Sequence, residues 1–142
     1  TETLQITFFI RKDCFCFVTS GLKMATHNEL GVLGEKLAVA LLQQKGYTIL
    51  ERNWRYLKAE IDILATKEDV LVVVEVKTRS TNVFGDPQNF ISSKKIKLLV
   101  MAANQYVIAR NLDHEVRFDV VAVLLQKNRK KLLHLENAFL HF

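Results

Sequence analysis

The chain has 142 residues, of which about half are apolar and a quarter charged, as in a soluble globular protein that buries a core without disulfides or metal staples. Its formal charge of +5 weakly indicates an anionic partner such as nucleic acid. The only cysteines, Cys14 and Cys16, exclude a disulfide framework and a cysteine-rich zinc site, and favour a reducing, cytoplasmic compartment. No apolar run approaches the roughly 18 residues that a membrane span requires.

Residues 1–23 differ in character from the rest of the chain. Met24 opens a sequence that resembles an ordinary start, so we interpret residues 1–23 as an N-terminal extension outside the core and residues 24–142 as one domain. The alternative is a genuine added strand, because Leu4, Ile6 and Phe8 alternate with polar residues.

Residues 28–45 are predicted to form a helix, with Asn28 as its cap and leucines at helical spacing. Gly46 is predicted to end this helix. Glu35 falls at the margin of the buried face, among small and apolar neighbours. A short strand is expected at residues 47–50, followed by a polar segment that contains Trp54, which we expect to pack in the core.

The middle of the chain predicts two strands, at residues 60–65 and 70–77, joined by a polar turn. A loop at residues 78–90 then precedes a second helix, capped by Ser92 or Ser93 and running to residue 110. Further strands are expected at residues 117–125 and 132–135. The order of helix, strands, helix and strands predicts an α/β or mixed α+β fold, with helices packed on a sheet.

The predicted hairpin carries the chemistry. If Ala65 pairs with Val70, Asp62 lies opposite Val73 and Glu60 opposite Glu75, and an even-numbered turn puts Asp62, Glu75 and Lys77 on one face. Facing carboxylates repel, and water, a lysine or a divalent cation such as Mg²⁺ relieves the repulsion. Such a cation activates water and stabilises phosphoryl charge, and an ammonium at Lys77 orients the water or neutralises developing charge. Glu35 would complete the group from the first helix.

An acid followed by Glu-x-Lys, with a glutamate on a preceding helix, resembles the PD-(D/E)xK nuclease superfamily. More narrowly, the chain resembles the YraN-like family of uncharacterised endonuclease-like proteins over residues 28–139. The segments that carry this resemblance are residues 34–38, 46–50, 53–55, 60–65, 74–79, 84–87, 117–121 and 136–139. One departure is Ala59, where the family usually has glycine.

The resemblance implies a restriction-endonuclease-like core, a central mixed sheet flanked by helices. It implies that Glu35, Asp62, Glu75 and the Val76 carbonyl surround Mg²⁺ or Mn²⁺, and that Lys77 is the motif lysine. The implied activity is metal-dependent hydrolysis of phosphodiester bonds in DNA, including branched or structured DNA. Holliday-junction resolvases in the same superfamily act as dimers, so a homodimer is expected by analogy.

Basic residues are candidates for DNA contact. Arg52, Arg55 and Arg79 flank the predicted hairpin, and Lys94 and Lys95 crowd a helix N-terminus, where cations are unfavourable unless an anion binds. The alternative for all five is solvated or structurally paired surface charge.

Other polar residues have less specific signals. Asp119 is expected to pair with Arg117 or Lys77, or to join the acidic site. The histidines at positions 27, 114, 134 and 141 lack ligand spacing and are interpreted as incidental. Two further functions remain open on sequence alone, a non-catalytic nucleic-acid-binding module and a protein-interaction protein.

Overall fold

The computed structural model describes residues 8–11, 14–17, 26–80 and 90–139. The elements in these residues are β1 (Phe8–Arg11), β2 (Cys14–Phe17), α1 (His27–Gln44), β3 (Thr48–Tyr56), β4 (Ala59–Lys67), β5 (Val70–Arg79), α2 (Ser93–Ala109), β6 (Glu115–Gln126) and β7 (Arg129–Leu135). The predicted loop at residues 78–90 begins later than expected, because β5 continues to Arg79, and residues 81–89 lie outside the described part.

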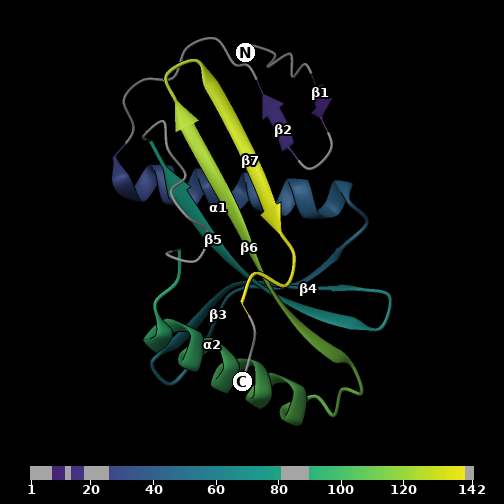
Figure 1. Ribbon diagram of the computed structural model, residues 1–142. Helices are drawn as coiled ribbons and strands as arrows, with labels where there is room; N and C mark the ends of the chain where they lie inside the picture. The colour runs from purple at the N-terminus through teal and green to yellow at the C-terminus, as the bar shows by residue number, and fades with distance from the viewer. Residues whose placement is uncertain (1–7, 12–13, 18–25, 81–89, 140–142) are drawn as a thin grey trace, which may run out of the picture.

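The strands form one mixed sheet in the order β1-β2-β7-β6-β5-β4-β3. Strands β5 and β6 are parallel, whereas the other neighbouring strands are antiparallel. Helix α1 packs on β5 and β6, and α2 packs on β4 and β3 (Figure 1). The expected α/β class is therefore confirmed, and a mixed sheet flanked by two helices is consistent with a restriction-endonuclease-like core.

Strand β5 is covered on both faces. Val72 and Val74 pack in a cluster with α1, while Leu71 and Val73 pack in a second cluster with α2. The uninterrupted apolar run in this strand follows from that double burial. We call the two sides of the sheet the α1 face and the α2 face.

Helix α1 begins one residue earlier than predicted. Its cap is Thr26 instead of Asn28, and Thr26 forms a capping box with Glu29, in which each side chain accepts a hydrogen bond from the other residue's backbone N–H. Gly46 follows the helix with φ +88°, a conformation that favours glycine, so its predicted role at the helix end is confirmed.

Strand β3 is longer than predicted. It extends from Thr48 to Tyr56, because it pairs with β4 along that length, with an irregularity between Ile49 and Glu51. The polar segment expected after residue 50 is therefore part of a strand, since pairing and packing override local propensity. Trp54 packs in the α2-side cluster as expected, with its ring 5.2 Å from that of Tyr106.

The predicted register of the β4–β5 hairpin was wrong by two residues. Lys67 pairs with Val70, and Leu64 lies opposite Val73, so only Glu68 and Asp69 form the turn. Glu68 has φ +55°, a backbone state that the sequence did not signal. Glu60 does not lie opposite Glu75 in this register, and it pairs with Arg55 of β3 on its other side.

The N-terminal segment contributes two strands to the sheet. Strand β2 pairs with β7, and β1 pairs with β2 (Figure 1). Of the three alternating apolar residues on which the alternative of an added strand rested, Phe8 begins β1. Leu4 and Ile6 lie outside the described residues. No helix in the described part of the chain is long and apolar enough to cross a membrane.

Helix α1 lies directly against β5 at Gly34. A Cβ atom at Gly34 would lie 3.1 Å from the Cβ of Thr78 and would overlap its Oγ1. A side chain is therefore excluded by space here, although the helix would otherwise favour alanine. Because Glu35 is the next residue, this contact also sets how far Glu35 lies from β5.

We expect Gly34→Ala to destabilise the fold by about 1–3 kcal/mol, because the added methyl forces α1 away from β5. Gly31→Ala in the same helix is the matched control, since its Cβ would meet nothing within 4 Å, and it should be neutral or stabilising by up to about 1 kcal/mol. Urea unfolding followed by circular dichroism measures both. Equal stability of the two variants would contradict the close approach.

Candidate active site

The sheet divides at Asp62. The pairs between β4 and β5 end at Ile63 and Val74, and the Asp62 Oδ2 atom then accepts a hydrogen bond of 2.8 Å from the Val76 backbone N–H. Ile63 packs on the α1 face but Ile61 packs on the α2 face, although residues two apart share a face in a regular strand. Strand β4 therefore turns at Asp62. Its carboxylate, instead of a backbone carbonyl of β4, accepts the hydrogen bond from the Val76 N–H of β5.

Asn53 bends the neighbouring strand at the same level. It lies between Arg52, which pairs with Ile63, and Trp54, which pairs with Ile61. Its φ of +50° is left-handed, a conformation that asparagine tolerates better than most residues. Its Nδ2 donates a hydrogen bond of 3.2 Å to Glu35 Oε2. This positioning role was not predicted, because residue 53 was expected in a polar segment after the strand at residues 47–50, where an asparagine carries no specific signal.

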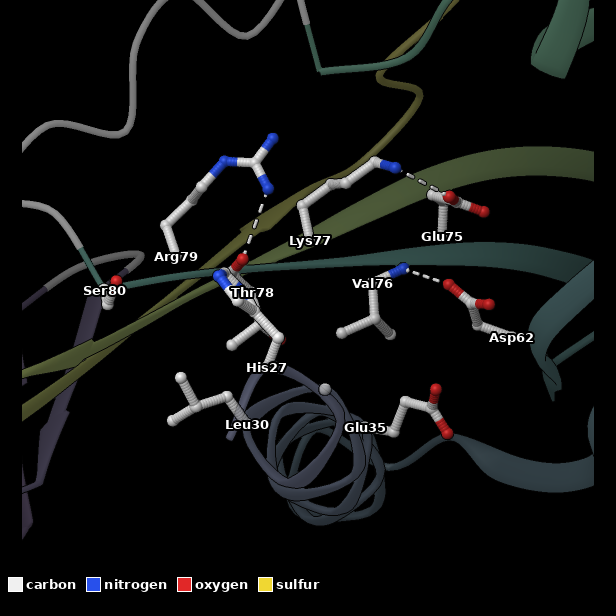
Figure 2. A pocket seen from close by; sticks show the side chains of 11 residues that line it. His27, Leu30, Glu35, Asp62, Glu75, Val76, Lys77, Thr78, Arg79 and Ser80 are labelled. Carbon is white, nitrogen blue, oxygen red and sulfur yellow. Dashed lines mark hydrogen bonds and ion pairs between the residues drawn. The ribbon is translucent and has the colours of Figure 1, made fainter. Parts of the chain in front are cut away.

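A cleft of about 460 Å³ opens between α1 and β5 beside this division. Figure 2 shows Glu35 reaching toward it from α1, with Asp62 beside Val76. The residues that line the cleft are His27, Leu30, Gly31, Glu35, Asp62, Glu75, Val76, Lys77, Thr78, Arg79 and Ser80. The four predicted catalytic residues and Val76 are thus brought together, and His27, interpreted as incidental, joins them.

The expectation that Asp62, Glu75 and Lys77 share one face was wrong. Glu75 and Lys77 lie on the opposite side of β5 from the Val76 side chain and Asp62 (Figure 2). The alternation along β5 puts Val76 on the α1 face and Glu75 and Lys77 on the other face. The turn of β4 at Asp62, and not the hairpin register, brings the Asp62 side chain to the Val76 side. The carboxylates of Asp62 and Glu75 approach the cleft from different faces, and the departure of β4 leaves room for them there.

The Glu75 carboxylate is almost buried, with 5% of its side chain exposed. Its Oε1 lies 3.0 Å from Lys77 Nζ, and its Oε2 lies 3.4 Å from Lys95 Nζ. The second contact is an ion pair without hydrogen-bond geometry, so the buried Oε2 atom accepts no hydrogen bond. A buried carboxylate oxygen without a hydrogen bond is costly, and this atom is well suited to accept a cation.

The pKa of Asp62 is raised to about 7. Burial is the largest cause, and the negative charges of Glu75 and Glu35 raise the pKa further, while the Val76 N–H and Lys95 act in the opposite direction. Near neutral pH the protonated and ionised forms of Asp62 are therefore both populated. A bound cation would favour the ionised form.

These donors fit a hard divalent cation of the Mg²⁺ type, which takes one or two carboxylates and keeps several waters. Asp62 and Glu75 would supply the carboxylates, and Val76, between Glu75 and Lys77 in sequence, would supply a backbone carbonyl. Glu35 instead contacts Asn53. Within the described ranges, no three acidic, histidine or cysteine side chains already converge as a metal-binding group, so any ion would rely on water for its remaining ligands.

The sequence profile of the uncharacterised protein family UPF0102 matches residues 34–123. The chain belongs to UPF0102. A UPF0102 protein of Flavobacterium psychrophilum is 57% identical over 119 residues, covering 84% of this chain and all of that protein. Another from Bacteroides thetaiotaomicron is 46% identical over 116 residues, covering 82% of this chain and 96% of that protein. The membership agrees with the YraN-like resemblance, and the matched range contains Glu35, Asp62, Glu75 and Lys77.

The predicted DNA-contacting residues divide into two groups in this UPF0102 chain. Arg79 lines the cleft and Lys95 contacts Glu75. Arg52, Arg55 and Lys94 are exposed outside the cleft lining, and Arg55 forms a surface ion pair of 3.3 Å with Glu60. Such an exposed pair contributes little to stability, so Arg55 remains available for other contacts.

Asp119 of this UPF0102 chain does not line the cleft. Its carboxylate accepts hydrogen bonds from Arg117, at 2.9 and 2.8 Å, and from the Asn137 backbone N–H at 3.0 Å. It also lies 2.8 Å from His134 Nε2. The expected pairing with Arg117 is confirmed. His134 was wrongly interpreted as incidental, since it is buried and its Nδ1 lies 3.2 Å from Lys45 Nζ.

Burial alone would raise the pKa of Asp119, but the hydrogen bonds from His134, Arg117 and Asn137 outweigh it and lower the pKa. The network ties β6 and β7 to Lys45 at the end of α1. Both oxygens of Asp119 accept hydrogen bonds within this network, whereas Glu75 Oε2 accepts none.

Asp62→Asn should raise stability at pH 8, because asparagine can still accept the Val76 hydrogen bond without burying a charge. The raised pKa of Asp62 means that the folded state binds a proton more tightly than the unfolded state. Wild-type stability therefore falls as pH rises from about 4 to about 7. In EDTA we expect the variant to be more stable by about 1–3 kcal/mol at pH 8, with the difference shrinking toward pH 4.

Urea unfolding at pH 8 and pH 5 measures this effect. Asp69→Asn, at an exposed position in the turn of the same hairpin, serves as the control and should change stability little at either pH. A loss of stability in Asp62→Asn at pH 8 would contradict the interpretation.

Proposed function

We propose that this chain is a divalent-cation-dependent endonuclease of the PD-(D/E)xK superfamily, which hydrolyses phosphodiester bonds in DNA, including branched or structured DNA. The main support is the Glu75 carboxylate, nearly buried with an Oε2 atom that accepts no hydrogen bond. Beside it lies Asp62, which has a raised pKa. A buried carboxylate oxygen without a hydrogen bond, near a second acid with a raised pKa, is unusual in a purely structural role and marks a candidate functional site.

In this proposal Asp62, Glu75 and the Val76 carbonyl hold the cation, and Glu35 supports it through water. The ion, when bound, lowers the pKa of a water molecule and stabilises negative charge on a phosphoryl oxygen. Asp62 enters the reaction ionised, and its Val76 hydrogen bond keeps the carboxylate oriented while the other oxygen stays available.

Lys77 orients the attacking water and offsets charge that develops on the phosphate. Its ammonium lies 3.0 Å from Glu75 and its side chain is 27% exposed, so it is held in place yet reaches the cleft. Partial exclusion of solvent strengthens its interaction with a developing anion. Arg79, farther along the same strand and in the cleft lining, contacts a phosphate next to the scissile one.

Purified protein with Mn²⁺ is expected to cleave at least one member of a panel of linear, flapped and four-way DNA. Glu75→Gln and Lys77→Met should each lower the rate by about 10²–10³-fold, because each removes charge that acts on the reacting phosphate. Glu51→Gln is the control, since Glu51 forms an ion pair with Arg110 at 3.0 Å away from the cleft lining. Cleavage of no substrate, or undiminished cleavage by Glu75→Gln, would exclude the proposal.

A non-catalytic DNA-binding module is the second candidate. It is favoured by the two lysines that already face both oxygens of Glu75 and by the lack of a ready three-ligand group among the described residues. Such a protein would bind DNA through Arg52, Arg55, Arg79, Lys94 and Lys95, with strong salt dependence and no need for a metal.

For either candidate, Arg79→Gln should weaken DNA binding uniformly across sequences and reduce the slope of log K against log salt by about 1, as expected for one lost phosphate contact. Fluorescence anisotropy between 50 and 200 mM salt, in EDTA, measures the slope. Arg110→Gln removes the same charge at the far end of α2 and should leave the slope unchanged. An identical slope for wild type and Arg79→Gln would remove Arg79 from the interface.

A further inference from the structure

Lys95 occupies a position that helix energetics disfavour. It lies in the first turn of α2, where its backbone N–H donates to the capping Ser92 side chain, and that turn contains no acidic residue. A cation at this end of a helix opposes the helix dipole. Some other interaction must therefore hold the Lys95 ammonium beside Glu75.

Two contacts to other elements hold the Lys95 ammonium. Its Nζ donates a hydrogen bond of 3.1 Å to the Glu60 backbone carbonyl of β4 and lies 3.4 Å from Glu75 Oε2 of β5. Lys94 and Lys97, its neighbours on α2, are exposed. Of these three lysines, Lys95 is thus the one whose ammonium contacts β4 and β5.

The charge of Glu75 is offset by two lysines that come from different elements of the fold. Lys77 comes from the same strand and lies 3.0 Å from Oε1. Lys95 comes from α2, and its longer contact with Oε2 leaves that oxygen without a hydrogen bond. The Lys95 contact is therefore the weaker one, and a flexible side chain that is 30% exposed has room to move away.

We infer that Lys95 is a built-in counter-ion, whose ammonium stands at Glu75 Oε2 in the metal-free protein and is displaced when a divalent cation binds there. The inference rests on the proposed function. A cation of the Mg²⁺ type would coordinate the oxygen at about 2.1 Å, within a few ångströms of the ammonium. Like charges so close repel, so the cation and Lys95 compete for one oxygen.

The competition predicts the sign of a binding change. Replacing Lys95 by the neutral methionine of similar length removes the competitor and keeps the apolar stem. Mn²⁺ should then bind Lys95→Met about five- to tenfold more tightly than wild type in the absence of DNA. Lys94→Met removes an exposed charge one residue away, and its affinity for Mn²⁺ should stay within about twofold of wild type.

Isothermal titration of each protein with Mn²⁺ alone at pH 8 measures the dissociation constants, and Lys95→Gln provides a second neutral variant if Lys95→Met does not fold. Tighter binding by a Lys95 variant, or binding by that variant when wild type binds none, supports displacement. Wild-type binding with equal or weaker binding by both Lys95 variants overturns this inference and leaves the proposed function intact. Lack of Mn²⁺ binding by every protein at millimolar concentration overturns both.

Discussion

Strands β4 and β5 separate beyond the Ile63–Val74 pair, where residues 59–62 of β4 no longer pair with β5. The acidic cleft depends on this separation. Antiparallel strands normally satisfy each other's backbone groups, so a strand that departs leaves its neighbour's N–H groups in need of acceptors. The Asp62 carboxylate accepts from Val76 and so occupies the place of a strand carbonyl. Its position is therefore set by the backbone of β5, which is more rigid than a side-chain rotamer alone.

The other parts of the cleft adjust to this separation. Asn53 turns β3 along with β4 through its left-handed backbone, and its amide reaches Glu35. Gly34 allows α1 to lie directly against Thr78, which brings the helix within reach of the opening. The site is thus assembled from three strands and two helices around the division of the sheet.

Two buried carboxylates show how differently one fold treats a charge. Asp119 receives hydrogen bonds on both oxygens, and its lowered pKa reflects complete compensation. Glu75 is about as buried but keeps one oxygen free of hydrogen bonds. A buried carboxylate whose oxygens all accept hydrogen bonds stabilises the fold, whereas one that keeps an oxygen without a hydrogen bond can still bind a cation or a donor. This contrast distinguishes the network at Asp119 from the site at Glu75 without reference to any relative.

The limits of prediction follow from which interactions are local. Helical spacing placed α1 and α2 to within a few residues, and the resemblance selected Glu35, Asp62, Glu75 and Lys77, which all line the cleft. The hairpin register was missed because a shift of two residues preserves the alternation of faces, so the hydrophobic pattern cannot distinguish the two registers.

Long-range contacts were harder to predict. The contact of Lys95 with Glu75 and the burial of His134 beside Asp119 join elements far apart in sequence. Spacing along the chain carries no information about either contact. Both depend on how the helices and the last strand pack against the sheet, which only the assembled fold determines.

The bend at Asn53 also affects the boundary of the sheet. Strand β3 is the last strand of the sheet on that side, and a flat edge strand presents a row of amides that can recruit a strand from another molecule. The irregularity after Ile49 and the left-handed Asn53 interrupt that row, and exposed Arg52 and Arg55 add charge to it. The distortion that directs Glu35 therefore also protects the protein against edge-to-edge aggregation.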